Sequence, residues 1–381
     1  MLPPAREGGL RILFSGMVAG DPHQGGAAWA VLQYVEGLRS LGHQVVLVEP
    51  VDPAALDPAG AVAEYFAALP FVGGSAALLG RGSTETIGLT YTELTRFASE
   101  ADLLINISGM LREERLLDPI PVRAFLDLDP GFNQVWEASG EGMGFDLHTH
   151  WVSVGQAIGR SGCPVPSCGR EWIHSLPPVA LEHWPSATGP PGAAYTTVGH
   201  WRSYGSLSYE GIEYGQRAHS LRELIELPEI SAARFRPALG IHPNEVSDLE
   251  ALRAAGWELL DPLTVAGAPA AYAEFIRGSR AELCVAKSGY VNGRTGWFSD
   301  RSACYLASGR PVVAQETGFS QFLPTGEGLL SFATAAEAAD CVNTIEADLG
   351  RHGRAARELA DEYLDARKVL SRLLDELGGV R

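Results

Sequence analysis

The stretch that decides the fold is KSGYVNGRTGWFSDRSACYLASGRPVVAQETGF, which spans residues 287–319. An apolar run at residues 282–286 leads into it and predicts a buried strand. Ser299 is a typical helix N-cap, so a helix is expected over residues 300–307. The apolar run at residues 311–314 predicts the next strand. The unit is therefore strand, polar loop, helix and strand, which is the repeating unit of a parallel α/β sheet.

Polar and charged residues gather where these strands are expected to end. The first N–H groups of a helix have no partner within the helix, and the helix dipole favours negative charge beside them. Phosphate groups therefore bind readily at such a helix start. Lys287, Arg294 and Arg301 would add positive charge there. The pattern predicts a phosphate-bearing ligand at this edge of the sheet.

Three motifs in and after this stretch carry a resemblance to a known family. They are Ala-Ser-Gly-Arg-Pro-Val-Val at residues 307–313, Thr-Gly-Phe at residues 317–319 and Gly-Glu-Gly-Leu-Leu-Ser-Phe at residues 326–332. Together they resemble the donor half of GT-B glycosyltransferases. The segment Gly-Trp-Phe-Ser-Asp-Arg-Ser at residues 296–302 is similar to a bacterial family 1-like or family 4-like subgroup. The resemblance implies an α/β protein of GT-B type, with two Rossmann-like domains that face each other across a cleft.

The same resemblance implies a nucleotide-diphosphate sugar as donor substrate, without a further cofactor or a metal. The loop after the first strand would approach the sugar or the diphosphate, and the first loop of the second domain would supply an arginine. One feature of many family members is missing, because Gly296 and Cys304 occupy the places of a Glu-x7-Glu pair. The residues expected to bind the donor are Gly25, Gly26, Arg202, Lys287, Tyr290, Arg294, Ser299, Asp300, Arg301, Ser302, Thr317 and Gly318.

The net charge of the chain bears on its partners. Its 381 residues include 29 basic and 46 acidic ones, which gives a formal charge of −17. Nucleic acids and anionic membrane surfaces attract basic proteins, so we expect neither as a partner. The sequence has no apolar run long enough to span a membrane and no signal-peptide pattern, and its five cysteines are scattered and odd in number. These features predict a cytoplasmic protein with reduced thiols.

The first half of the chain has the pattern of a Rossmann-like domain. An apolar strand at residues 10–18 precedes a Gly-rich loop, a helix over residues 27–41 and a strand at residues 44–49. The G-x-G-x-x-G spacing of NAD-binding proteins is absent from this loop, so NAD is not expected.

Proline density and apolar spacing predict how the rest of the chain is divided. Seven prolines between residues 163 and 191 mark the connection between domains. We expect an acceptor-side domain over residues 1–188 and a donor domain over residues 189–360. Apolar residues at helical spacing predict a helix over about residues 355–377. Residues 361–381 would then pack back on the first domain, as the resemblance implies.

Acidic and histidine residues stand in pairs where two strands of the first domain are expected to end. Asp127 and Asp129 are two residues apart, as are His148 and His150, so each pair would share one face of a strand. Four such groups are able to hold a metal ion. Polar side chains at the rim of a cleft are the simpler explanation, and no metal site is expected.

A glycosyltransferase that inverts configuration needs a general base beside the acceptor hydroxyl. His23 and Asp21 lie in the loop expected to face the cleft, and Asp129 lies at a strand end, so these three are the catalytic candidates. The leading hypothesis is transfer of a hexose or pentose to a small-molecule acceptor, such as a metabolite or natural product. A homodimer is compatible with the sequence. A nucleotide-sugar epimerase and a non-catalytic sugar-nucleotide-binding or scaffold protein stay open as alternatives.

Overall fold

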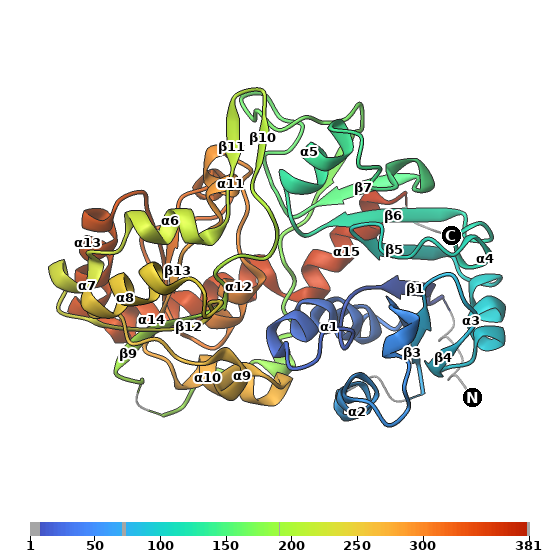
Figure 1. Ribbon diagram of the computed structural model, residues 1–381, viewed down its shortest axis with the longest axis horizontal. Coiled ribbons are helices and arrows are strands. Elements are labelled where there is room, and N and C mark those ends of the chain that lie inside the picture. The colour runs from blue at the N-terminus through green and yellow to red at the C-terminus, as the bar shows by residue number, and fades with distance from the viewer. Residues whose placement is uncertain (1–7, 71–73, 190, 379–381) are drawn as a thin grey trace.

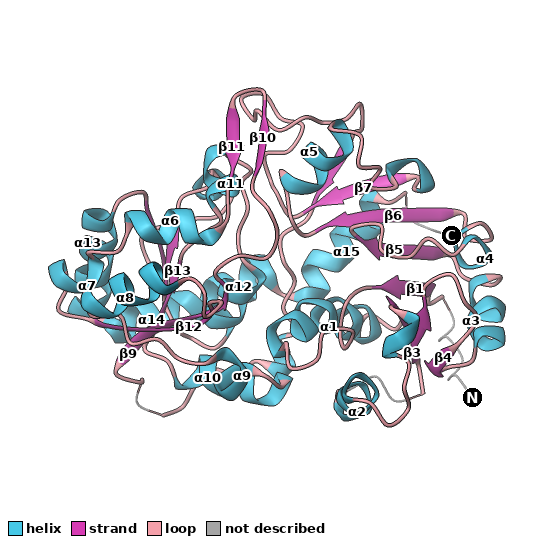
Figure 2. Ribbon diagram, in the orientation of Figure 1, coloured by secondary structure: helices cyan, strands magenta, loops and turns pink. Residues whose placement is uncertain are grey.

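The computed structural model describes residues 8–70, 74–189 and 191–378. The chain forms two α/β domains that lie side by side, with helix α1 between them (Figure 1). Figure 2 shows strands surrounded by helices in both domains. Among the described residues, no helix is long and apolar enough to cross a membrane, and the five cysteines are free thiols.

The first domain is built on an eight-stranded sheet with the order β4-β3-β2-β1-β5-β6-β7-β8. Neighbouring strands are parallel except β3 and β4. The central strand β1 pairs on both sides, with Ile12 opposite Val45 and Leu103. The strands are β1 (Arg11–Ser15), β2 (Gln44–Val51), β3 (Ala76–Gly80), β4 (Thr86–Gly88), β5 (Leu103–Ile107), β6 (Val122–Asp127), β7 (His150–Ser153) and β8 (Trp172–His174). The helices are α1 (Gly25–Ser40), α2 (Ala61–Ala68), α3 (Tyr91–Ala98), α4 (Glu114–Leu117) and α5 (Phe132–Ala138).

The second domain is built on a five-stranded parallel sheet with the order β12-β9-β13-β14-β15. The strands are β9 (Ala194–His200), β12 (Arg234–Gly240), β13 (Ala281–Cys284), β14 (Val312–Gln315) and β15 (Leu329–Phe332), and β10 (Leu207–Tyr209) and β11 (Ile212–Tyr214) form a separate hairpin. The helices are α6 (Arg217–Glu223), α7 (Leu227–Ile230), α8 (Val246–Ala254), α9 (Pro262–Ala266), α10 (Pro269–Gly278), α11 (Ser288–Asn292), α12 (Asp300–Ala307), α13 (Ala335–Ala347) and α14 (Leu349–Leu359).

The unit that opened the sequence analysis is present as β13, α12 and β14. Ser299 caps α12 by accepting a hydrogen bond from the backbone N–H of Arg301 at 3.2 Å, which confirms the predicted helix start. Val312 to Ala314 pair in parallel with Glu282 to Cys284 on the neighbouring strand. The loop between β13 and α12 contains the short helix α11, where the sequence predicts only a loop.

The single helix predicted near the C-terminus is wrong, because two helices stand there. Helix α14 ends at Leu359, a π-helical turn covers Ala360–Leu364, and α15 covers Ala366–Glu376. The break lies at Asp365, whose side chain caps α15 by accepting from the N–H of Arg367 at 3.0 Å. On either side of it, the chain pairs with Val179 of the first domain through two backbone hydrogen bonds of 2.7 and 2.9 Å.

Helix α15 packs against α1 of the first domain (Figure 1). The contact is close at Gly37, where a Cβ atom would lie 2.5 Å from Leu370 and 2.7 Å from Ala366. Glycine therefore lets the two helices approach more closely than any other residue would. The C-terminal helix completes the core of the first domain after the chain has built the second.

Several short strands escaped the sequence analysis. Strands β3 and β4 extend one edge of the first sheet, and β8 forms its other edge. Strand β8 lies inside the proline-rich segment taken as a connection, so that segment begins within the first domain. Strands of three to five residues carry too few alternating positions for a periodicity to be recognised.

The prediction that Asp127 and Asp129 share one strand face, and that His148 and His150 share another, is wrong. Asp127 is fully buried and accepts hydrogen bonds from Asn133, Gln134 and Ser153 at 2.6 to 2.7 Å. Burial raises the pKa of this carboxyl to about 6. Asp129 lies beyond the end of β6 and points elsewhere, as described below.

The histidine pair is divided in the same way. His148 precedes β7 and is buried, and its ring lies 3.0 Å from the Asn106 amide and 2.8 Å from the carbonyl oxygen of Gly144. His150 contacts the hydroxyl of Thr149 instead. In the part of the chain that the structure describes, no group of three or more His, Cys, Asp or Glu residues is arranged to hold a metal ion.

Substitution of Gly37 tests the contact between α1 and α15. In a free helix Ala is favoured over Gly by about 1 kcal/mol, but overpacking a filled contact costs about 1–3 kcal/mol. We expect Gly37→Ala to lower the free energy of unfolding in urea. Gly350→Ala on α14 is the control, because the nearest atom to its Cβ would be 3.6 Å away. Equal stabilisation of both variants would contradict the close packing of α15.

The buried His148 predicts a loss of stability in mild acid. Burial lowers the pKa of His148 to about 4, against about 6.5 in an unfolded chain. Its contribution to stability is therefore complete above pH 6.5 and is lost as the pH falls toward 4, by at most about 3 kcal/mol. Urea unfolding at pH 7 and pH 4.5 should show a smaller pH effect in His148→Gln than in the wild type. His242→Gln, at an exposed site, should keep the wild-type pH effect.

Candidate active site

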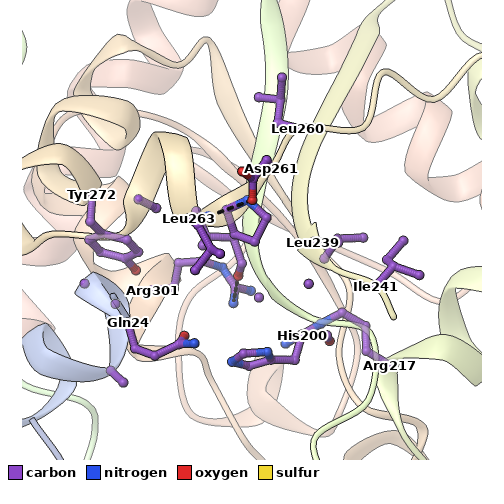
Figure 3. A pocket seen from close by; sticks show the side chains of 18 of the residues that line it. Gln24, His200, Arg217, Leu239, Ile241, Leu260, Asp261, Leu263, Tyr272 and Arg301 are labelled. Atoms are coloured by element: carbon purple, nitrogen blue, oxygen red, sulfur yellow. Dashed lines mark hydrogen bonds between the residues drawn. The ribbon is translucent and has the colours of Figure 1, made fainter. Parts of the chain in front are cut away.

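A cavity of about 650 Å³ lies between the two domains (Figure 3). The first domain contributes the loop before α1 and the start of that helix, residues 23–27. The second domain contributes the ends of β9 and β12 and the segment that leads into α9. Ligands of parallel α/β sheets bind outside the carboxyl ends of the strands, which is where this cavity lies.

Helix α1 points its N-terminus into the cavity. The Gln24 side chain does not cap the helix, and the first intrahelical bond runs from the N–H of Ala28 to the carbonyl of Gln24 at 3.0 Å. The N–H groups of residues 25–27 therefore have no partner within the helix. A 16-residue helix of this kind presents partial positive charge to whatever occupies the cavity.

Gly25 and Gly26 were expected to approach a donor, and both line the cavity. Each also lies against the second domain. A Cβ on Gly25 would be 2.5 Å from the carbonyl oxygens of Ala266 and Ala268, and one on Gly26 would be 2.9 Å from the ring of Tyr272. The two glycines thus allow the second domain to close over the start of α1.

The cavity is rich in positive charge although the chain is acidic. Four cations line it, Arg217, Arg253, Lys287 and Arg301, against two carboxylates, Asp261 and Asp300. The whole chain has the opposite balance, with 29 basic and 46 acidic residues. A concave site of one sign focuses the field and favours a ligand of the other sign, here an anion.

Arg217 is a cavity residue that the sequence analysis missed. Arg217 is 8% exposed, and its guanidinium donates to the carbonyl oxygens of Val285 at 2.9 Å and His200 at 2.6 Å. Burial and the neighbouring Arg301 lower the pKa of Arg217 to about 10. Its place at the first position of α6, directly after a loop that follows a strand, was a signal for a ligand-facing cation.

His200 at the end of β9 also lines the cavity and was missed (Figure 3). Partial desolvation lowers the pKa of its imidazole, and Arg217 and Lys287 add to this effect. Asp21 acts in the opposite direction, which places this catalytic candidate near His200. Asp21 itself is exposed and does not line the cavity.

His23 lies at the boundary of the cavity with a left-handed backbone, φ +66°. Its ring meets that of Tyr65 edge-on at 5.5 Å between centroids. The imidazole is exposed, so it is accessible to a substrate. Of the three catalytic candidates, His23 is the one that lines the cavity.

Asp129 joins the domains instead of facing the cavity. Its carboxylate is 2.9 and 3.0 Å from Nζ of Lys287, and it also accepts hydrogen bonds from the hydroxyls of Tyr204 and Tyr290. Asp129 belongs to the first domain and its three partners to the second. Both carboxylate oxygens are therefore occupied, which leaves little capacity to take a proton from a substrate.

Aromatic rings also surround the Lys287 ammonium, which donates a hydrogen bond to the hydroxyl of Tyr204 at 2.5 Å. The nitrogen lies 4.2 Å from the ring centre of Tyr204, 5.1 Å from that of Phe132 and 5.4 Å from that of Tyr290. Burial lowers the pKa of Lys287, and Asp129 opposes this shift. We call Asp129, Phe132, Tyr204, Lys287 and Tyr290 the interdomain cage.

The other expected donor residues are spread over several environments. Arg301 lines the cavity but is held by Glu282 at 2.5 Å and by the carbonyl of Val198 at 2.8 Å. Asp300 lines the cavity too, and burial raises its pKa. The remaining expected residues do not line the cavity. Arg202 pairs with Glu245, Arg294 is exposed, and Tyr290 belongs to the interdomain cage. Ser299 and Ser302 are buried at the start of α12, and Thr317 and Gly318 pack against residues 294–297.

The loop after β1 is held by a carboxylate of the protein itself. Glu49 at the end of β2 is buried and accepts hydrogen bonds from the N–H groups of Val18, Ala19 and Gly20 at 2.8 to 3.0 Å. Desolvation raises the pKa of Glu49. These N–H groups are therefore already used, and an anionic ligand is left with the start of α1.

The positions that replace the Glu-x7-Glu pair have structural surroundings. Gly296 has φ +70° and donates its N–H to the carbonyl of Thr317 at 2.8 Å. Cys304 is buried, and its sulfur lies 3.4 Å from the side-chain nitrogen of Gln33 on α1. Neither residue lines the cavity.

Comparisons with known proteins bear on the fold. No protein-family model matches the sequence, and no curated protein matches it. Solved structures do match over nearly the whole chain. AviGT4, a glycosyltransferase involved in avilamycin A biosynthesis, is 14% identical with a TM-score of 0.54, and the match covers 97% of this chain and 98% of that one.

Two further structures agree with this result. Alr3699/HepE of Anabaena in complex with UDP and glucose is 12% identical with a TM-score of 0.59, over 97% of this chain and 100% of that one. An alpha-glucosyltransferase in complex with UDP-glucose and DNA is 11% identical with a TM-score of 0.61, over the same shares. The two α/β domains, their facing cavity and these matches together show that the chain has the GT-B fold.

Proposed function

We propose that this protein is a glycosyltransferase that moves a sugar from a nucleotide-diphosphate donor to a hydroxyl group of a small-molecule acceptor. The observation that carries the proposal is the interdomain cavity, into which the free N–H groups of α1 and a cluster of cations converge. The similar structures contain UDP or UDP-glucose in the HepE and alpha-glucosyltransferase complexes, which supports a donor of this class.

The cavity offers separate surroundings for the two parts of a nucleotide diphosphate. The start of α1, Arg217 and Lys287 are the groups that would stabilise the diphosphate as it leaves with the bonding electron pair. Leu239, Ile241 and Leu260 form an apolar wall beside β12 (Figure 3). The nucleobase of the donor would pack on this wall, because the faces of a nucleobase are apolar and its edge is polar.

A transfer that inverts configuration requires three changes at the reacting atoms. The acceptor oxygen forms a bond to the anomeric carbon, the bond from that carbon to the diphosphate breaks, and the hydroxyl proton moves to a base. We assign the base role to His23, which is exposed and lines the cavity on the side of the first domain. Asp129 serves to hold Lys287 and the two domains together.

Nucleotide binding tests the assignment of the cations. A lost charge-assisted hydrogen bond costs about 1.5–3 kcal/mol, so Lys287→Met should weaken binding of a nucleoside diphosphate by about 10- to 100-fold. The measurement is the rise in melting temperature with UDP, GDP, TDP or ADP, relative to the same variant without ligand. Arg202→Met should bind as the wild type does, since Arg202 pairs with Glu245 outside the cavity. A wild type that no nucleotide stabilises at millimolar concentration would contradict the proposed function.

Two substitutions separate the base candidates. His23→Gln should lower kcat by about 10²- to 10⁴-fold while nucleotide binding persists, because a general base contributes on that scale. Asp129→Asn should lower the melting temperature of the free protein and weaken nucleotide binding through Lys287, with a much smaller loss of kcat than His23→Gln. Sugar transfer is measured with the nucleotide sugar whose nucleotide stabilises the protein most. A loss of kcat in Asp129→Asn with His23→Gln unaffected would reverse the assignment, and donor turnover without any acceptor would favour an epimerase or hydrolase.

A further inference from the structure

A second cavity of about 400 Å³ adjoins the first. It lies between α2 of the first domain and α9 and α10 of the second, and we call it the α2 chamber. His23 and Leu263 line both cavities, so these two side chains form the boundary between them. The hydroxyl of Tyr65 donates to the carbonyl of Gly267 at 3.0 Å, which joins the two walls of the chamber.

The α2 chamber differs from the larger cavity in chemistry. Its walls are formed mainly by apolar side chains, with Glu64 as its one carboxylate, and among the described residues that line it there is no lysine or arginine. The larger cavity has four such cations. One chamber is therefore suited to an anion and the other to an uncharged apolar group. The apolar side chains of the wall include Ala61, Ala68, Leu69, Leu263 and Pro269.

Leu263 adds exposed apolar surface at the boundary of the two cavities. Its side chain is 58% exposed, more than the other exposed large hydrophobic residues of the described chain, such as Val246 at 54%. Its backbone is held, because Asp261 caps α9 by accepting from the N–H of Leu263 at 3.0 Å (Figure 3). A leucine held at the boundary of two cavities gains from any ligand that covers it.

We propose that the α2 chamber binds the apolar body of the acceptor, a hydroxylated aromatic or alicyclic compound. This inference rests on the proposed function. A volume of about 400 Å³ lies within the range of about 300–1,000 Å³ in which proteins bind small organic molecules. The acceptor hydroxyl then lies beside His23 at the boundary and faces the donor in the larger cavity.

Two neighbouring alanines on α2 provide a matched test. Ala67 and Ala68 are both exposed, but only Ala68 lines the chamber. In Ala68→Trp the indole occupies the space of the ligand, while in Ala67→Trp the chamber stays open. The probe is 4-methylumbelliferone, an aromatic compound with one hydroxyl, titrated into the full-length protein saturated with the nucleotide that stabilises it most. We expect at least a tenfold rise in Kd for Ala68→Trp and no change for Ala67→Trp.

A second variant from the opposite wall covers the case in which Ala68→Trp fails to fold. Ala271 on α10 lines the chamber and does not line the larger cavity, so Ala271→Phe should weaken probe binding in the same way. Nucleotide stabilisation should persist in all three variants. Equal probe affinity in Ala68→Trp, Ala271→Phe and the wild type would overturn the proposal.

The other outcomes distinguish this inference from the proposed function. A wild type that binds a nucleotide but prefers glucose to both 4-methylumbelliferone and cyclohexanol overturns the apolar acceptor and leaves the transferase proposal intact. A wild type that binds no nucleotide contradicts the transferase proposal. If it then still binds the probe in a manner sensitive to Ala68→Trp, the chamber is an apolar binding site that serves another reaction.

Discussion

The arrangement of the molecule depends on helix α1, which is buried between the two domains. Two of its buried polar side chains, Trp29 and Gln33, bond to segments on either side of it. Trp29 donates to the carbonyl of Pro269 at 2.8 Å, and Gln33 accepts from the N–H of Ala180 at 2.7 Å while its nitrogen contacts Cys304. A buried polar group without a partner costs free energy, so these bonds fix how the second domain lies on the helix. With the domains held in this way, the start of the helix opens into the cavity.

Small residues on α1 make the same arrangement sterically possible. Gly25 and Gly37 lie where other parts of the chain approach within contact distance of the helix backbone. One approach comes from the second domain and the other from α15. The first domain is therefore closed only by the last helix of the chain, and its core is complete only after the second domain has been made. Folding of the two domains is coupled through this connectivity.

The sequence predicted the fold well because its decisive unit combines several local signals. An apolar strand, the Ser299 cap and a following strand occur in order, and the structure has each of them. Asp365, at the break between the last two helices, is a typical N-cap residue. Apolar residues continue at helical spacing across it, so the sequence predicted a single helix. The cations that line the cavity were harder to predict from the sequence. Arg202 and Arg294 were expected there because they lie in loops after strands, whereas Arg217, which does line it, is the first residue of a helix. Which guanidinium reaches the cavity depends on partners distant in sequence, such as Glu245 for Arg202.

The interdomain cage has a consequence for how the two domains move. Separation of the domains would break the pair of Lys287 with Asp129 and bring the rings of Phe132, Tyr204 and Tyr290 into water together. The hydrophobic cost and the loss of the ion pair would arise in the same step, so wide opening is strongly disfavoured. Exchange of ligands is then left to the opposite edge, where α2 faces α9. Under the proposed function, release of a ligand at that edge would require the domains to move about the cage, and movements of this kind limit turnover in many enzymes.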